Sequence, residues 1–165
     1  MILQYATFEK AVAQLKKSLD FLHSEMARKD PGLREQFRAA VIQAFEYTYE
    51  LAYKMVRRQL KQIVPNPAEL DEMAYMDLMR TAAKAGLVRE ATPFKAYREM
   101  RNITSRTYDS DKAEEIIAVM DAFLKDMNFL LEELKQRNHE ADWASLKDDF
   151  RKIIQKDFVR ISNDL

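Results

Sequence analysis

The scarcity of helix-breaking residues is the feature that most constrains how this chain folds. Its 165 residues include only two glycines and four prolines, and apolar residues recur three and four positions apart along most of its length. That spacing places apolar side chains on one face of an α-helix. The first such stripe consists of Phe8, Val12, Leu15, Leu19, Leu22 and Met26. We therefore expect an all-α protein that folds as an antiparallel, up-and-down helical bundle.

The few breakers divide the first half of the chain into helices. Asp30-Pro31-Gly32 should end the first helix, and a second should run from about residue 33 to residue 63. The segment 65–67 (Pro-Asn-Pro) ends that helix and starts a third, with its Asn as the cap and its second Pro at the first helical position. The third helix should close near Ala85, because Gly86 can adopt the left-handed conformation of a helix C-terminus.

The second half is expected to contain three more helices. Thr92-Pro93 begins a short fourth helix, which should fray over residues 102–108, where Asn, Ser and Thr cluster. Asp109 or Ser110 caps a fifth helix that continues to about Leu134, and residues 136–139 look like a turn. A sixth amphipathic helix is then outlined by Trp143, Leu146, Phe150, Ile153, Ile154 and Phe158.

These expectations give two parts. Residues 1–137 form the bundle, and residues 138–165 form an appended C-terminal helix packed on the bundle or at an interface. For this last helix, extra packing within the bundle and a contact with a second copy or a partner are equally compatible with the sequence.

Composition excludes several classes of protein. The absence of cysteine rules out disulfides and thiolate chemistry and fits a reducing, cytoplasmic location. The 27 basic and 27 acidic residues balance, so global charge predicts no nucleic-acid or membrane partner. No apolar run approaches the ~20 residues of a membrane span, and the N-terminus lacks the pattern of a secretory signal. We expect no contact with membranes.

Nucleotide loops and metal centres find no support in the sequence. Gly32 and Gly86 cannot build a glycine-rich phosphate loop. A di-metal carboxylate bundle needs Glu-x-x-His pairs, yet neither His23 nor His139 has a glutamate three residues before it. We expect neither a metal nor a cofactor, with His139 exposed to solvent and His23 at the edge of the core.

Glu46 and Glu50 share one face of the second helix and are the nearest approach to a catalytic carboxylate pair. Lys54 lies four residues after Glu50, which is the spacing of an ordinary helical ion pair. We therefore expect Glu50 to pair with Lys54.

Residues 89–106 stand out by their charge. They contain five basic and two acidic residues, a local net charge of +3. Arg98 and Arg101 are three apart and so lie on one helix face, while Asn102 and Arg106 would share a neighbouring face if the helix persisted. Guanidinium groups near a fraying helix end suit phosphate or nucleotide recognition. The alternative is that these arginines only solvate a surface helix and bind its terminal carbonyls.

Three blocks of sequence resemble the nucleotidyltransferase substrate-binding proteins, a branch of the HEPN superfamily of small helical nucleotide- and RNA-binding domains. Residues 38–54 (RAAVIQAFEYTYELAYK) resemble the family's Phe-Glu-(Tyr/Phe) helix with its following Glu-Leu and Lys. Residues 80–88 (RTAAKAGLV) are similar to its Ala-x-x-x-Gly-Leu-Ile turn, and residues 101–109 (RNITSRTYD) lie where it carries Arg-Asn-x-x-Ser-His-x-Tyr. The third block is the specific one, and together they span about residues 8–135.

The resemblance implies a homodimer encoded beside a minimal nucleotidyltransferase. In many such pairs the HEPN protein is a toxin with metal-independent RNase activity and the transferase is the antitoxin. The family's arginine and histidine lie near the dimer cleft: the histidine helps a ribose 2′-hydroxyl attack its own phosphate, and the arginine stabilises the developing charge. In some pairs the antitoxin attaches AMP to the tyrosine two residues after the histidine.

Carried over to this chain, Arg101 matches the motif arginine, Asn102 its polar neighbour and Tyr108 the modifiable tyrosine. Position 106, however, is Arg where the family has His, and a guanidinium that stays protonated cannot act as a general base. The catalytic pair thus becomes Arg101 with Arg106, and Arg98, Asn102 and Ser105 complete an expected RNA or nucleotide cleft. The resemblance leaves three readings open: an RNase-type toxin inactivated at position 106, a non-catalytic substrate-binding subunit of a transferase, and a dimeric scaffold.

Overall fold

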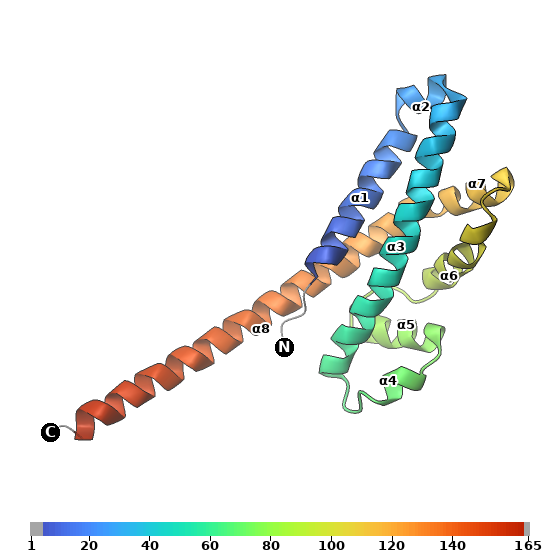
Figure 1. Ribbon diagram of the computed structural model, residues 1–165. Helices are drawn as coiled ribbons and strands as arrows, with labels where there is room; N and C mark the ends of the chain where they lie inside the picture. Colours follow the sequence, from blue (N-terminus) through green and yellow to red (C-terminus); the bar gives the residue numbers. More distant parts are fainter. Residues whose placement is uncertain (1–4, 164–165) are drawn as a thin grey trace.

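Every regular element of the part of the chain described by the computed structural model is helical (Figure 1). The model describes the backbone of residues 5–163 and the side chains of these residues apart from 141 and 156–163. The elements in chain order are α1 (Ala6–Leu22), α2 (Glu25–Lys29), α3 (Pro31–Ile63), α4 (Glu69–Glu72), α5 (Tyr75–Lys84), α6 (Pro93–Ile103), the 3₁₀ turn η1 (Thr104–Arg106), α7 (Ser110–Ala118) and α8 (Met120–Asn163). The all-α expectation is confirmed.

Helix α3 is the axis of the bundle. It runs antiparallel to α1, the first part of α8 crosses both, and α4 to α7 lie along its remaining side (Figure 1). Its start is fixed locally, because Asp30 Oδ1 accepts hydrogen bonds from the backbone N–H groups of Gly32 and Leu33 and Pro31 occupies the first helical turn. The predicted break at Asp30-Pro31-Gly32 therefore begins α3.

The first helix is shorter than its apolar stripe suggests. Helix α1 ends at Leu22, and Ser24 caps the separate short helix α2 by accepting a hydrogen bond from the N–H of Ala27. Met26 is 54% exposed, so its assignment to the core stripe was wrong. A serine that can bond to the backbone favours a new helix start over continuation of the old one.

The expected third helix is likewise divided. The backbone is extended at Met73 and Ala74, which separates α4 from α5. Asn66 does not cap the backbone but donates a side-chain hydrogen bond to Glu69 Oε1 at 2.8 Å. The end of α5 agrees with expectation: Gly86 has a φ of 74°, and the N–H of Leu87 donates to the carbonyl of Ala82.

Three aromatic rings hold the centre of the core together. Phe45 of α3 meets Phe123 of α8 edge-on, with ring centroids 4.9 Å apart, and Tyr97 of α6 meets Phe123 in the same manner at 5.0 Å. All three side chains are buried. Edge-to-face pairs are favourable beyond the apolar area that they bury, so α6 is held against both long helices.

Helix α8 contradicts the predicted turn at residues 136–139. The helix is continuous through them because none of the four residues is glycine or proline, and two of their side chains make hydrogen bonds that fit the helix. Asn138 donates to the carbonyl of Leu134, and Arg137 donates to the carbonyl of Ala85. The interruption lies earlier, at Val119, between α7 and α8. His139 is exposed, as predicted.

The distal part of α8 extends away from the bundle as a single rod (Figure 1). Its large apolar side chains from position 143 to position 154 are 57–68% exposed, so within this chain they do not pack on the bundle as one of the two predictions had it. Phe158, the last residue of the predicted stripe, lies outside the described side chains. The division of the chain at residue 138 remains a prediction, and one unbroken helix crosses it. Within residues 5–163, no helix is long and apolar enough to cross a membrane.

Two arginines of α3 bind one carboxylate of α7. Glu114 accepts hydrogen bonds from Arg34 at 2.7 Å and from Arg38 at 2.9 Å, and Arg38 also donates to the Ser110 hydroxyl. The hydrogen bond from Arg34, reinforced by Arg38, lowers the pKa of Glu114 from 4.5 to about 2. This ion cluster ties the start of α7 to α3.

Because the pKa of Glu114 is lower in the folded than in the unfolded protein, its ionised form stabilises the fold above about pH 4.5, and this contribution is lost as pH falls towards 2. We expect Glu114→Gln to lower the free energy of unfolding at pH 7 and to flatten its fall between pH 4.5 and 2. Urea denaturation over that range measures both effects. Glu115→Gln is the matched control, since Glu115 pairs with Lys112 of its own helix. Parallel profiles for wild type and Glu114→Gln would show that the cluster contributes nothing.

Candidate functional site

The segment from Arg98 to Tyr108, called the α6–α7 corner below, follows the predicted fraying. Helix α6 gives way at Ile103 to the 3₁₀ turn η1, and Thr104 supports this turn by donating its hydroxyl hydrogen to the carbonyl of Arg101 at 2.9 Å. Asp109 then caps α7 by accepting from the N–H of Asp111. Thr92, in contrast, makes no capping hydrogen bond, so only Pro93 marks the start of α6 as predicted.

Arg101 is held in place by two neighbours. Its Nε donates to Glu50 Oε1 of α3 at 3.2 Å, and one terminal nitrogen donates to Thr104 Oγ1 at 3.1 Å. Its other terminal nitrogen makes no hydrogen bond within the described part of the chain. The guanidinium is therefore oriented by the protein and still has donors for an anionic ligand.

The partner of Glu50 was predicted incorrectly. Glu50 pairs with Arg101 across two helices instead of with Lys54 on its own helix. Helical spacing alone favoured the pair of Glu50 with Lys54. The packing of α6 against α3 brings the guanidinium of Arg101 to the same carboxylate instead. This contact is the feature of the corner that sequence reasoning missed, because it depends on which helices are neighbours.

Arg98 stacks on a cluster of tyrosines. Its guanidinium carbon lies 5.0 Å from the ring centroid of Tyr75 on α5, and Tyr75 in turn stacks with Tyr49 and Tyr53 of α3 at 6.0 and 5.8 Å. Burial raises the pKa of Tyr75 well above its ordinary value, so this ring stays neutral. Arg98 gains a cation–π contact and remains exposed, with no carboxylate partner among the described residues.

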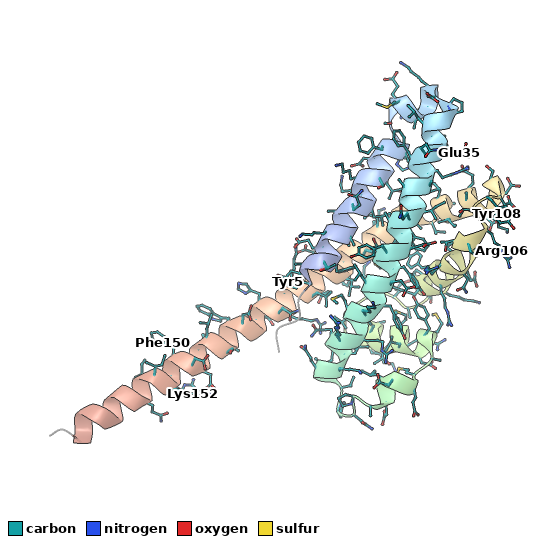
Figure 2. All side chains as sticks on the ribbon, in the orientation of Figure 1. Tyr5, Glu35, Arg106, Tyr108, Phe150 and Lys152 are labelled. Carbon is teal, nitrogen blue, oxygen red and sulfur yellow. The ribbon has the colours of Figure 1, made fainter. Side chains whose placement is uncertain are left out.

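The remaining predicted residues face solvent on the same corner. Asn102, Ser105 and Arg106 are exposed, and Tyr108 is 88% exposed, as predicted for an accessible phenol. Figure 2 shows Arg106 and Tyr108 on the outer surface where α6 turns towards α7. The Arg106 side chain makes no hydrogen bond or ion pair to the described residues. Because the α-helix ends at Ile103, Asn102 and Arg106 do not share a regular helix face.

A polar groove of about 250 Å³ lies between α3 and the corner. This groove could not be predicted from the sequence, because its walls are far apart in the chain. Its polar lining consists of Glu35, Arg38, Gln43, Glu46, Thr104 and Thr107. Within the described residues, no group of three metal-binding side chains could hold an ion.

The base of α6 is anchored to α8 by a buried polar contact. Asp126 of α8 accepts a hydrogen bond from the Tyr97 hydroxyl at 2.5 Å. Its other carboxylate oxygen forms an ion pair with Arg89 at 2.5 Å. Burial, together with the hydrogen bond to Asp126, raises the pKa of Tyr97, which keeps the phenol protonated. The hydrogen bond from Tyr97 to Asp126 and the ring contact of Tyr97 with Phe123 together fix the position of α6, and so of the corner that follows it.

Taken together, residues 98–108 of the corner offer cations and include no histidine. Three arginines and an exposed phenol lie on it, while the two histidines of the chain lie elsewhere, His23 just after α1 and His139 on α8. Such a surface can bind phosphate through charge-assisted hydrogen bonds, whereas the guanidinium of Arg106 cannot itself accept a proton from a hydroxyl.

An all-α bundle with this sequence at the α6–α7 corner defines a HEPN-like, nucleotidyltransferase substrate-binding type of domain. The chain belongs to the family described as nucleotidyltransferase substrate binding protein like, whose model matches residues 3–136.

Two relatives from Haemophilus influenzae agree with this assignment. The chain is 46% identical over 100 residues to a protein named Probable ribonuclease HepT, which covers 61% of this chain and 68% of that protein. It also matches the solved structure of HI0074, described as revealing the fold of a substrate-binding domain of a nucleotidyltransferase. That match has a TM-score of 0.76 at 34% identity and covers 80% of this chain and 99% of the other. The matched family region ends at residue 136, before the distal part of α8.

Removing the Tyr97 hydroxyl tests the anchor beneath the corner. Tyr97→Phe keeps the ring packing and leaves one buried oxygen of Asp126 without its donor, which typically costs about 1–3 kcal/mol. We expect the free energy of unfolding, measured by urea denaturation, to fall by that amount. Tyr47→Phe, at an exposed tyrosine of α3, should change it by less than about 0.5 kcal/mol. Equal effects of the two substitutions would show that the hydrogen bond to Asp126 does not stabilise the fold.

Proposed function

We propose that this protein is the HEPN component of a two-protein toxin–antitoxin system whose other member is a minimal nucleotidyltransferase. It binds RNA or nucleotide phosphate at the α6–α7 corner, and with arginine at position 106 it does not cleave RNA. The proposal includes the homodimer expected from the family resemblance. The observation that carries it is the arginine at position 106, on an exposed corner where the family motif has its histidine.

The geometry supports binding through two differently prepared cations. Arg101 is oriented by Glu50 and Thr104 and keeps donors for a ligand, whereas Arg106 is exposed and unpaired among the described residues. A guanidinium held by neighbours suits a defined phosphate position, and an exposed, unpaired one adds charge attraction. Contacts of this kind give binding that depends on phosphate and weakens as salt rises.

The presence of arginine instead of histidine at position 106 is the reason why we expect no cleavage. Attack by a ribose 2′-hydroxyl requires a group that accepts its proton, and histidine does so because its ordinary pKa lies near 6.5. Arginine stays protonated in proteins and so cannot take that role. Arg101 could still stabilise a developing negative charge, so the corner retains one half of the family's catalytic pair.

Tyr108 is the proposed acceptor of AMP from the partner transferase. Its phenol is almost fully exposed, two residues after Arg106. Attaching AMP there would form a phosphodiester to the phenolic oxygen and release pyrophosphate from ATP. The added phosphate would lie near Arg106, where charge-assisted hydrogen bonds could hold it over the corner.

A second function is supported by the same arginine and by the description of HI0074. In that reading the chain is a non-catalytic subunit that binds nucleotide or presents an acceptor surface to its transferase, and it never cleaves RNA. The two functions differ in what a histidine at position 106 would do.

We expect Arg106→His to restore metal-independent cleavage of single-stranded RNA. General-base catalysis typically contributes ~10²–10⁴-fold, so activity should rise clearly above that of the parent chain. Cleavage of a labelled RNA in the presence of EDTA measures this, and expression of the variant alone should slow growth. Adding Arg101→Ala should abolish both effects.

Arg98→His is the matched control, because it places a histidine on the same corner outside the motif. It should not cleave RNA. The parent chain should bind the same RNA with an affinity that falls as salt rises. If Arg106→His is folded and binds RNA yet leaves it intact, the ribonuclease ancestry is wrong and the non-catalytic subunit is the better account.

Modification of Tyr108 is tested with the transferase encoded beside this chain. Incubation of the two proteins with ATP and magnesium, followed by peptide mass mapping, should place AMP on the peptide that contains Tyr108. Tyr108→Phe should remove the modification, and Tyr47→Phe, at another exposed tyrosine, should retain it. Modification that persists in Tyr108→Phe would identify a different acceptor.

A further inference from the structure

The distal part of α8 carries an apolar stripe that the rest of the chain does not cover. Trp143, Leu146, Phe150 and Ile153 follow one another at gaps of three, four and three residues, and Ile154 lies beside them. Gaps of this kind define the contact seam of a two-helix coiled coil. All five are more than half exposed, and the family region ends before them. We call these five residues the tail stripe.

The bundle of the same chain cannot cover this stripe. Helix α8 runs unbroken from Met120 to Asn163, and its distal part points away from α1 and α3 (Figures 1 and 2). Shallow hollows lie between the side chains along the stripe, one lined by Trp143, Leu146, Lys147 and Phe150. Their position suits the side chains of a facing helix, which insert between those of the first in such pairs.

The charges around the stripe are divided between its two ends. Residues 140–149 contain four acidic residues and one basic residue, for a net charge of −3, whereas residues 151–160 contain four basic residues and one acidic residue, for a net charge of +3. A parallel pair of these helices would place like charges together along both halves. An antiparallel pair places the negative half of one helix against the positive half of the other, which is favourable in both halves.

This pattern is self-complementary about a two-fold axis that passes near the middle of the stripe. We propose that the tail stripe is a self-association surface on which two copies of this chain pair their α8 helices antiparallel. A second copy is the occupant because it supplies an equally long apolar seam with the reversed order of charge. The proposal does not depend on the function of the α6–α7 corner.

Sedimentation equilibrium of the full chain over a concentration series tests the surface. Leu146→Glu/Phe150→Glu puts two carboxylates into the seam and should weaken self-association at least tenfold. Ala144→Glu/Ser145→Glu is the matched control: it adds the same charge to exposed positions of the same helix outside the stripe and should stay within about twofold of wild type. Circular dichroism should show that both variants remain folded, because the substituted side chains are exposed.

Orientation is tested by a single spin label. Because the chain has no cysteine, Gln136→Cys provides a unique attachment point. Residue 136 lies about 12 residues before the middle of the stripe, so antiparallel pairing separates the two labels by roughly 36 Å at 1.5 Å per residue. This separation should appear in wild-type background and vanish in Leu146→Glu/Phe150→Glu.

Two results would overturn the proposal. Equal association of wild type and Leu146→Glu/Phe150→Glu would mean that the stripe does not join copies of this chain, and the transferase would then be the next occupant to test. A separation of about 10–20 Å between the labels would mean that the helices pair in parallel, against the charge argument.

Discussion

The contact of Phe45, Tyr97 and Phe123 is the interaction on which the rest of the structure depends. Each ring comes from a different helix, and the three meet edge-on in the buried centre of the bundle. Because α6 is held there against α3 and α8, the residues after it emerge at one defined corner. The Arg101–Glu50 pair and the cation–π contact of Arg98 both follow from this placement, since each partner belongs to another helix.

The two arginines of the motif, Arg101 and Arg106, differ in how the protein holds them. Arg101 is partly buried and fixed between a carboxylate and a hydroxyl, whereas Arg106 projects from a 3₁₀ turn without a partner in the described part of the chain. Orienting a guanidinium before a ligand arrives reduces the entropy lost on binding. A histidine at position 106 would be equally exposed, so under the proposed function a cleaving corner and a binding corner would differ in one titratable group, with the fold unchanged.

Periodicity and breakers predicted the fold class, the extent of α3 and the start of α7 from the sequence alone, because each depends on contacts within a few residues. Local rules failed where two of them competed. The stripe through Met26 predicted one helix, but the cap at Ser24 began another. The polar residues 136–139 suggested a turn, but none of them breaks a helix, and Arg137 and Asn138 make hydrogen bonds within the continuous α8 and to the end of α5. The pairing of Glu50 required knowledge of which helices touch, which no spacing rule contains. For the candidate site, the motif identified the segment, while the groove beside it became visible only in three dimensions.

The unbroken helix α8 has a mechanical consequence. From residue 138 to residue 163 it extends about 38 Å at 1.5 Å per residue, with no hinge between its buried and its exposed part. It therefore acts as a lever arm: a tilt of about 5° where α8 crosses α1 and α3 would move its far end by roughly 3 Å over that length. A small movement of Phe123 or Asp126 in the core would therefore produce a larger displacement at the C-terminal end of α8.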